Sequence, residues 1–367
     1  MTETPTNSYR DAGVDTAAGD LAVELMKSAV SATHGPGVVG GVGGFAGLFD
    51  VSFLKEFRKP LLATSTDGVG TKVAIAQAID KHDTIGIDLV GMVVDDIVVV
   101  GAKPLIMTDY IACGRVEPAR IADIVAGIAR GCSATGTALV GGETAEHPGL
   151  LGPDDYDVAG AAVGAVEADE LLGADRVGDG DVVVAMESSG LHSNGFSLVR
   201  SILRTAGLEF TAHSDDLGGM VGEVLLEPTR LYTTPLLDTI AQHPGAIHSL
   251  SHVTGGGIAA NLARVLPLGS WVEVERSTWS PAPVFQTLAE MGSFTLESVE
   301  GTWNLGIGMF AVVDARAADA VVATLGAAGI RSWAVGSVST AAHPLDGFEQ
   351  GAKGVDGGAV KLVGTYS

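Results

Sequence analysis

The sequence contains few cysteines, few basic residues and no uninterrupted apolar run. Its 367 residues include two cysteines, Cys113 and Cys132, with neither CxxC spacing nor a histidine cluster beside them. This argues against a zinc site and against a disulfide framework. Lysine and arginine number 21 against 44 aspartates and glutamates, which gives a formal net charge of −23. A surface this acidic repels a phosphate backbone, so we expect no nucleic-acid partner.

The most apolar stretch, residues 85–107, is interrupted by Asp88, Asp95, Asp96 and Lys103. A membrane-spanning helix needs about 20 apolar residues with few or no charges, so this stretch does not qualify. The segment from Met1 to Arg10 is polar and lacks the apolar core of a secretion signal. We therefore expect a soluble, cytoplasmic protein with no membrane partner.

Apolar residues and glycine are both plentiful. Hydrophobic residues make up 46% of the chain, which excludes disorder as its main state. The length exceeds what one typical core requires and predicts two domains. An acidic, glycine-bearing segment, residues 167–181, marks the boundary. We expect an N-terminal domain over 1–168 and a C-terminal domain over 169–367.

Strands and helices alternate along the chain without a strict βαβ rhythm, which predicts an α+β fold. In the N-terminal domain the expected helices are 16–33, 84–100 and 117–135, and the strands are 61–66, 104–113, 137–140 and 156–166. In the C-terminal domain the expected strands are 182–186, 247–253, 271–275, 306–313 and 333–338, and the helices are 194–206, 229–242, 256–265, 281–291 and 316–328.

A glycine-rich segment, residues 35–49, follows the first expected helix. The spacing of Gly35, Gly37 and Gly40 fits G-x-G-x-x-G, but that pattern indicates dinucleotide binding only when a strand precedes it and a helix follows. Here a helix precedes it. Because glycine lets backbone N–H groups approach a ligand, we interpret the segment as a phosphate-covering or active-site loop. A flexible linker is the alternative, although linkers are rarely so apolar.

The segment TDGVGTK, residues 66–72, combines a carboxylate at a strand end with glycines, a hydroxyl and a lysine. It is not a Walker A motif, because Thr71 separates Lys72 from the preceding glycine. The combination of Asp67, Gly68 and Lys72 suits the binding of Mg²⁺ and phosphate. An ordinary tight turn with a surface lysine is the alternative.

Carboxylates also occur in apolar surroundings. Asp95 and Asp96 lie inside an expected apolar helix, where an unpaired charge costs several kcal/mol, so a metal or a lysine should compensate. Adjacent helical residues point about 100° apart, so we expect only one of the two to face a metal. The segment GGETAEHPG, from Gly141, presents Glu143. Asp67, Asp96 and Glu143 come from separate elements and could converge on Mg²⁺, which prefers few oxygen ligands plus phosphates.

Two similar turns occur in the C-terminal domain. SSGLHSNG, residues 188–195, ends a strand and opens a helix that Ser193 or Asn194 can cap, with His192 just before the cap. HVTGGG, residues 252–257, repeats the design. Helix N-termini bind anions, so the pair suggests a phosphate-bearing substrate. Simple capping turns are the alternative.

Taken together, these motifs resemble the aminoimidazole ribonucleotide synthetase family, also called the phosphoribosylformylglycinamidine cyclo-ligases. The resemblance covers nearly the whole chain and runs through YRDAGVD from Tyr9, GGVGGFAGLF, STDGVGTK, HDTIGIDLVGM, GGETAEHPG, YDVAG, SSGLHSNGFSLVR, EPTRLY, HVTGGGI and WNLGIGM. It implies ATP-dependent cyclisation of formylglycinamidine ribonucleotide to 5-aminoimidazole ribonucleotide, with release of ADP and phosphate. It also implies a homodimer in which the N-terminal sheets join into a barrel-like core.

The resemblance further implies roles for individual residues. ATP and Mg²⁺ would contact Lys27, Gly43, Gly44, Asp67, Gly68, Lys72, Asp96 and Glu143, with Asp67, Asp96 and Glu143 as metal ligands and both lysines facing phosphates. The ribonucleotide would contact His192, Ser193, Asn194, His252, Thr254, Gly255 and Gly256. Catalysis would use Lys72 and His192, the latter polarising or protonating the formyl oxygen. Two positions depart from the family pattern: Asp95 replaces the usual asparagine, and His147 a methionine.

Two other functions compete with this interpretation. The same architecture serves selenophosphate synthesis and thiamine phosphate phosphorylation. Selenophosphate synthesis usually calls for a reactive cysteine or selenocysteine near the glycine loop, and no cysteine precedes Cys113. A non-catalytic nucleotide-binding or scaffold subunit is the other rival. The intact set of carboxylates argues against it, because a scaffold does not require buried acids.

Overall fold

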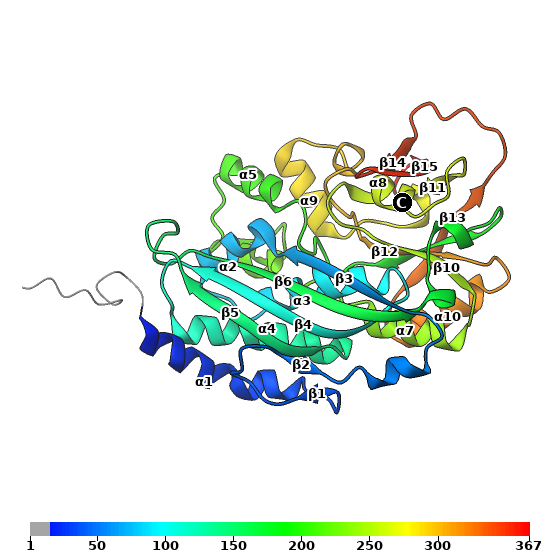
Figure 1. Ribbon diagram of the computed structural model, residues 1–367. Helices are drawn as coiled ribbons and strands as arrows, with labels where there is room; N and C mark the ends of the chain where they lie inside the picture. Colours follow the sequence, from blue (N-terminus) through cyan, green and yellow to red (C-terminus); the bar gives the residue numbers. More distant parts are fainter. Residues whose placement is uncertain (1–14) are drawn as a thin grey trace, which may run out of the picture.

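The computed structural model describes residues 15–367 of the chain (Figure 1). The start of the YRDAGVD motif, at Tyr9, lies outside the described residues. The described part forms two domains, each built on one large sheet. The four-stranded sheet has the order β3-β6-β4-β5, and the seven-stranded sheet has the order β10-β12-β7-β13-β11-β15-β14.

The N-terminal domain contains helices α1 (Thr16–Ala32), α2 (Val73–Ile79), α3 (Ile85–Val98) and α4 (Pro118–Thr135), and strands β1 (Val38–Val39), β2 (Leu48–Phe49), β3 (Pro60–Gly68), β4 (Lys103–Cys113), β5 (Ala138–Glu146) and β6 (Tyr156–Glu167). Short 3₁₀ turns cover Ser52–Glu56 (η1) and Gly70–Lys72 (η2).

The C-terminal domain contains strands β7 (Val182–Glu187), β8 (His213–Ser214), β9 (Gly219–Met220), β10 (Ile247–His252), β11 (Trp271–Glu275), β12 (Ile307–Val313), β13 (Ser332–Ser339), β14 (Glu349–Ala352) and β15 (Val355–Val363). Its helices are α5 (Phe196–Ala206), α6 (Val221–Leu225), α7 (Thr233–Gln242), α8 (Gly257–Ala263), α9 (Pro283–Gly292) and α10 (Ala318–Ala327).

Helices α3 and α4 pack against one face of the four-stranded sheet (Figure 1). Helix α3 is buried around almost its whole circumference, and Asp96 is its one exposed residue. The two helices approach closely at Gly86, where a Cβ atom would lie 2.1 Å from the backbone nitrogen of Ile128. Any larger residue at this position would push α3 away from α4.

The opposite face of this sheet is covered by no helix of the described chain. It carries small and medium side chains that alternate with the buried ones, as the pleat requires. On β6 and β4, Ala161 lies opposite Thr108, whereas the next pair, Ala162 and Met107, is buried on the helix side. Leu62 is 67% exposed on the same open face.

The observed elements differ from the expected ones in a few places. The segment GGETAE, expected as a loop, is the second half of β5, because β4 pairs with it in parallel up to Glu146. Helix α7 starts at Thr233 instead of 229. Helix α2 and the hairpin β14–β15 were not expected. Among the described residues, no helix has both the length and the apolar character needed to cross a membrane.

Candidate functional site

A charged cluster lies where the two domains meet. Asp67 is near the end of β3, Asp96 is on the exposed side of α3, and His252 ends β10. The Nδ1 atom of His252 lies 2.9 Å from a carboxylate oxygen of Asp96. Burial alone would lower the pKa of His252, but the hydrogen bond to Asp96 and the surrounding carboxylates raise it above its ordinary value. The cluster therefore favours an imidazolium held among acids.

The pKa of Asp67 is raised, first because the carboxylate loses hydration at the domain junction and then because Asp96 is negatively charged. A cation bound nearby would therefore stabilise the charged form of Asp67. Beside this cluster is a cleft of about 290 Å³, whose walls include Ser65, Asp96, His252, Thr254, Asn261 and Arg264. Since Mg²⁺ commonly uses one or two carboxylates and completes its shell with water and phosphates, Asp67 and Asp96 fit such an ion.

Glu143 does not join these two carboxylates, so the prediction that all three converge within one chain is wrong. In the sheet, Asp67 lies opposite Gly160, Gly160 opposite Asp109, and Asp109 opposite Gly142. Three strand spacings separate Asp67 from Gly142 by about 14 Å, and Glu143 is the next residue along β5. In the part of the chain that the structure describes, no group of three or more His, Cys, Asp or Glu side chains is placed to hold a metal.

Glu143 instead lines a second cavity, of about 260 Å³, between α1, the glycine loop and the strands β4 and β5. Gly43 and Gly44 contribute to its wall, so the structure brings these three predicted contacts together. Lys27 lies on α1 with its side chain exposed. Asp109 also lines this cavity and was missed by sequence reasoning, although an aspartate inside an expected apolar strand is a usable signal. Burial raises its pKa to about 7.

Lys72 is not available to a phosphate, so its predicted role as a phosphate contact is wrong. Its side chain is fully buried, and its ammonium group donates to Asp88 at 2.8 Å, to the His192 carbonyl at 3.0 Å and to the Glu227 carbonyl at 2.7 Å. An ammonium group has three N–H donors, and all three are used. Lys72 thus joins the N-terminal domain to two segments of the C-terminal domain.

Asp88 and Asp95 complete this junction. We call it the interdomain clamp, and it consists of Lys72, Asp88, Asp95 and the segment 229–233. Asp88 accepts hydrogen bonds from the backbone N–H and the hydroxyl of Thr229, at 2.8 and 2.7 Å. Asp95, two helical turns later on the same face of α3, accepts from the N–H and hydroxyl of Thr233. Burial raises the pKa of Asp95 to about 6. Of the adjacent pair, Asp95 is thus structural and only Asp96 faces the cleft.

His192 is buried and neutral, which argues against protonation of the formyl oxygen by an imidazolium, whereas the other predicted role, polarisation of that oxygen, stays a prediction. Its side chain is 1% exposed, and its Nε2 atom accepts a hydrogen bond from the backbone N–H of Ser189 at 3.2 Å. Nδ1 therefore carries the proton, and it has no partner among the described residues. Burial, followed by the charges of His252 and Lys72, holds the pKa of His192 well below its ordinary value.

This neutrality predicts a pH effect on stability. The unfolded chain protonates His192 below its ordinary pKa of 6.5, whereas the folded chain does not, so wild-type protein should lose stability as the pH falls below this value. About one pH unit below 6.5, the free energy of unfolding of His192→Gln should have fallen by roughly 1 kcal/mol less than that of wild-type protein. Urea denaturation at both pH values measures the difference. His252→Gln is the matched comparison. The pKa of His252 is raised, so wild-type protein should lose the stability contributed by His252 as the pH rises above 6.5. The stability difference between wild type and His252→Gln should therefore have the opposite sign and appear above pH 6.5.

The two predicted substrate turns meet in the structure. A Cβ atom at Gly255 would lie 3.6 Å from the amide oxygen of Asn194. Ser193 is nearly buried and its hydroxyl has no partner among the described residues. Gly256 and Gly257 have positive φ values of 104° and 74°. At Gly257 a Cβ atom would also collide with the carbonyl of Glu300, at 1.7 Å, so glycine is required to form this turn.

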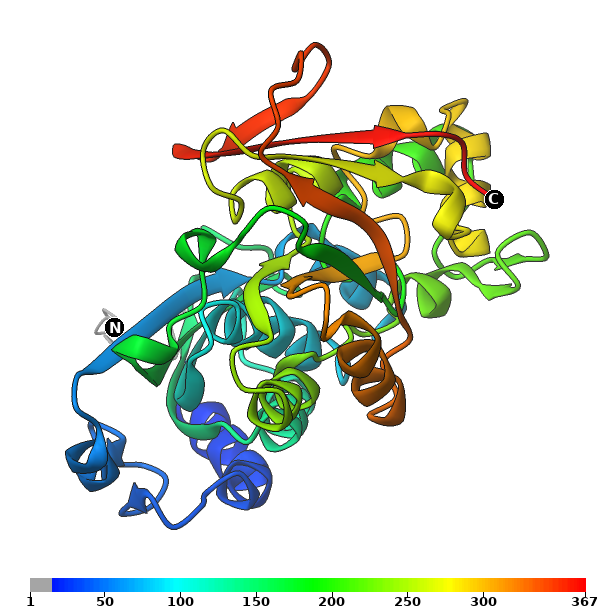
Figure 2. The ribbon, with the colours of Figure 1, turned by 90° about the vertical axis from the view of Figure 1, so that its right-hand side faces the viewer.

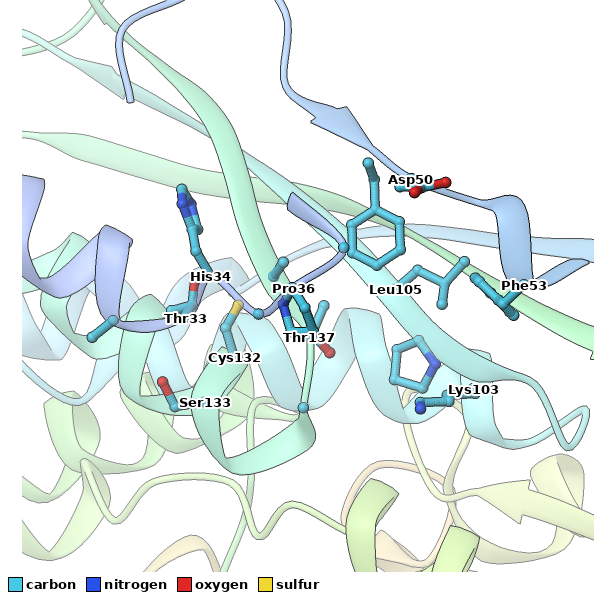
Figure 3. Close-up of a pocket in the computed structure, with 17 residues that line it drawn as sticks. Thr33, His34, Pro36, Asp50, Phe53, Lys103, Leu105, Cys132, Ser133 and Thr137 are labelled. Carbon is cyan, nitrogen blue, oxygen red and sulfur yellow. The ribbon is translucent and has the colours of Figure 1, made fainter. Parts of the chain in front are cut away.

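A third cavity, of about 490 Å³, lies in the N-terminal domain (Figure 3). It is bounded by His34 in the loop after α1, Phe53 in η1, Lys103 at the start of β4 and Cys132 in α4. Although it is larger than the other two, it contains none of the predicted site residues. Asp50 and Lys103 are its charged side chains. Its size alone does not indicate a catalytic site.

Comparison with known proteins agrees with the two-domain arrangement. Residues 54–166 match the family model described as AIR synthase related protein, N-terminal domain, and residues 178–344 match the corresponding C-terminal domain. Two curated relatives are named phosphoribosylformylglycinamidine cyclo-ligase. That of Synechocystis sp. is 48% identical over 306 residues, which is 83% of this chain and 89% of the relative. That of Thermosynechococcus vestitus is 47% identical over 341 residues, which is 93% of this chain and 98% of the relative.

Solved structures share the fold at lower identity. The hydrogenase maturation protein HypE of E. coli has a TM-score of 0.64 at 18% identity, covering 96% of this chain and 94% of HypE. A HypE structure in complex with ATP has a TM-score of 0.59 at 16% identity, covering 98% of this chain and 93% of that one. At such identities the likeness shows the fold alone.

Proposed function

The chain belongs to the AIR synthase related protein family, and we infer that it catalyses the ATP-dependent cyclisation of formylglycinamidine ribonucleotide to 5-aminoimidazole ribonucleotide in purine biosynthesis. It is a C–N bond-forming ligase that releases ADP and phosphate. The observation that carries this conclusion is the high identity to cyclo-ligases over most of the chain and through both domains.

We assign the two ligands to different domains. Residues 1–168 would bind ATP with Mg²⁺, and residues 169–367 would bind the ribonucleotide. Asp67 and Asp96 support the metal assignment because both are carboxylates of the charged cluster at the domain junction and the charge of Asp96 acts on Asp67. Gly43 and Gly44 support the assignment of the glycine loop to ATP, because they line a cavity.

When bound, ATP would supply the phosphoryl group that turns the formyl oxygen into a leaving group, and Mg²⁺, held by Asp67 and Asp96, would neutralise charge on the phosphates. The chain's own residues provide charge and orientation. Asp96 holds His252 so that its Nε2 atom, buried and without a partner among the described residues, can donate to an oxygen of the ligand. The turns at 188–195 and 252–257 would contribute Ser193, Asn194 and Thr254 as further contacts to the ligand near His252. His192 serves this site through its backbone carbonyl, which fixes Lys72.

Product analysis tests this function directly. Purified protein with formylglycinamidine ribonucleotide, ATP and Mg²⁺ should form 5-aminoimidazole ribonucleotide and ADP in equal amounts. ATP hydrolysis should depend on the ribonucleotide. Hydrolysis stimulated instead by selenide or thiamine phosphate would reassign the chemistry within the same fold, and binding without turnover would indicate a scaffold.

We also propose that the chain is a homodimer joined through the open face of the four-stranded sheet into a barrel-like core. The support is the surface itself: side chains such as Ala161, Thr108 and Leu62 that no helix of the described chain covers. Apolar sheet faces are normally packed against another layer. A second copy of the same sheet would supply that layer.

Ala161→Arg tests this arrangement, because it places a charge at the centre of the open face. The variant should be largely monomeric where wild-type protein is dimeric, as measured by analytical ultracentrifugation at several concentrations. Ala119→Arg, at an exposed position of α4, is the matched control and should leave the mass unchanged. A dimer that survives Ala161→Arg would place the interface elsewhere.

A further inference from the structure

The hairpin β14–β15 ends in a tight turn beside the interdomain cleft. Ala352 pairs with Val355, so Lys353 and Gly354 alone form the turn. Both have positive φ, 50° and 78°, which is the conformation of a type I′ hairpin turn. The turn therefore presents Lys353 at the tip of a defined structure. It also lies beyond residue 344, where the match to the C-terminal family model ends.

The hairpin is held against α8, the helix that follows the 252–257 turn. A Cβ atom at Gly357 would lie 2.1 Å from the carbonyl oxygen of Ala263, so the two backbones are in close contact there. Strand β15 also pairs in parallel with β11 (Figure 2). Val355, next to the tip, lines the cleft together with His252 and Thr254. The position of the tip is thus fixed relative to the cleft.

The cleft contains donors that lack acceptors. The Nε2 atom of His252 and the Nε atom of Arg264 are buried and have no partner among the described residues. Lys353 is exposed at the hairpin tip. Lys72 is occupied in the interdomain clamp. His252, Arg264 and Lys353 therefore provide positive charge for an anionic ligand in the cleft.

We propose that Lys353 is a phosphate-binding residue, which contacts a phosphate group of the ligand in this cleft from the hairpin tip. This proposal rests on the function inferred above. The phosphate belongs either to the ribonucleotide, as a monoester, or to ATP, as a polyphosphate. An ammonium on a long flexible side chain suits either as a point charge.

Isothermal titration calorimetry on the full chain distinguishes the two sources. One arm uses formylglycinamidine ribonucleotide alone, and the other a non-hydrolysable ATP analogue with Mg²⁺. Lys353→Ala should weaken binding of one of the two by about tenfold, the loss of one hydrogen bond to a charged group, and leave the other within about twofold. Lys353→Arg should retain most of the wild-type affinity. Lys55→Ala, which removes an exposed lysine of η1, is the matched control for net charge.

Salt provides a readout that loss of structure would not reproduce. Raising the ionic strength from about 0.05 to about 0.3 M should weaken wild-type binding more than binding by Lys353→Ala, because the variant has one ion pair fewer to screen. Unchanged affinity for both probes in Lys353→Ala would overturn the proposal. Absence of cyclisation by the wild-type enzyme would instead overturn the proposed function, and the two failures are therefore distinct.

Discussion

Asp96→Asn should lower kcat/KM for cyclisation by about 100-fold, equivalent to roughly 3 kcal/mol of transition-state stabilisation. Asp96 is the cleft-facing carboxylate of α3, and it contributes both to the proposed metal site and to the charge of His252. An asparagine keeps the shape but removes the negative charge. Steady-state rates measured across a Mg²⁺ titration should show that the variant requires more Mg²⁺ for half-maximal activity.

Asp95→Asn is the matched control, since it makes the same chemical change one residue away. Asp95 accepts hydrogen bonds from Tyr232 and Thr233 and faces away from the cleft. Its substitution should lower stability while the Mg²⁺ dependence of the remaining activity stays unchanged. Asp67→Asn should resemble Asp96→Asn. If Asp96→Asn lost activity with an unaltered Mg²⁺ requirement, Asp96 would act through His252 alone and the metal assignment would fail.

Lys72→Met should lower the free energy of unfolding by about 3–5 kcal/mol, measured by urea denaturation. The substitution leaves the Asp88 carboxylate buried without its counter-ion and removes the bonds to the carbonyls of His192 and Glu227. Full burial already works against both charges, lowering the pKa of Lys72 and raising that of Asp88. The pair is therefore costly to break, although a well-packed apolar replacement of both partners can be tolerated.

Two comparisons isolate this effect. The Lys81–Asp83 ion pair has the same 2.8 Å separation but its side chains are 39% and 46% exposed, so Lys81→Met should cost less than about 1 kcal/mol. The double variant Lys72→Met with Asp88→Asn should be more stable than the sum of the single losses predicts, because it leaves no buried charge unpaired. Equal losses for Lys72→Met and Lys81→Met would contradict the interdomain clamp.

The interdomain clamp also explains how stability and function share one helix. Asp88 and Asp95 use one face of α3 to anchor the segment 229–233, while Asp96, about 100° around the helix from Asp95, faces the cleft. Anchoring the C-terminal domain sets the position of His252 relative to Asp96. Changes in the clamp should therefore weaken activity through misplacement, even though none of its side chains reaches the cleft.

Some properties of the site followed from the linear sequence. Periodic apolar residues predicted α3 within two residues at each end, because helical burial repeats locally. The helical offset between Asp95 and Asp96 predicted that they would diverge, and the structure confirms this. The family also followed from local motifs, which can be recognised without knowing any contact, and the comparisons confirm it.

Other expectations failed where distant parts of the chain decide the outcome. Nothing near Lys72 in the sequence indicates that its partners lie 120 and 155 residues away. GGETAE has the composition of a loop, yet pairing with β4 makes it a strand and places Glu143 three strands away from Asp67. The hairpin that carries Lys353 was missed because its glycines weaken the local strand signal.

The sequence by itself determined most of the helices, the two-domain division, the family and the types of charged group available. These properties depend on neighbouring residues or on letters in a fixed order. Only the tertiary structure decided which charges pair with each other and which remain free for a ligand. The physical reason is that burial and pairing depend on distances in space. Lys72, the lysine predicted to contact phosphate, instead forms three hydrogen bonds that join the domains.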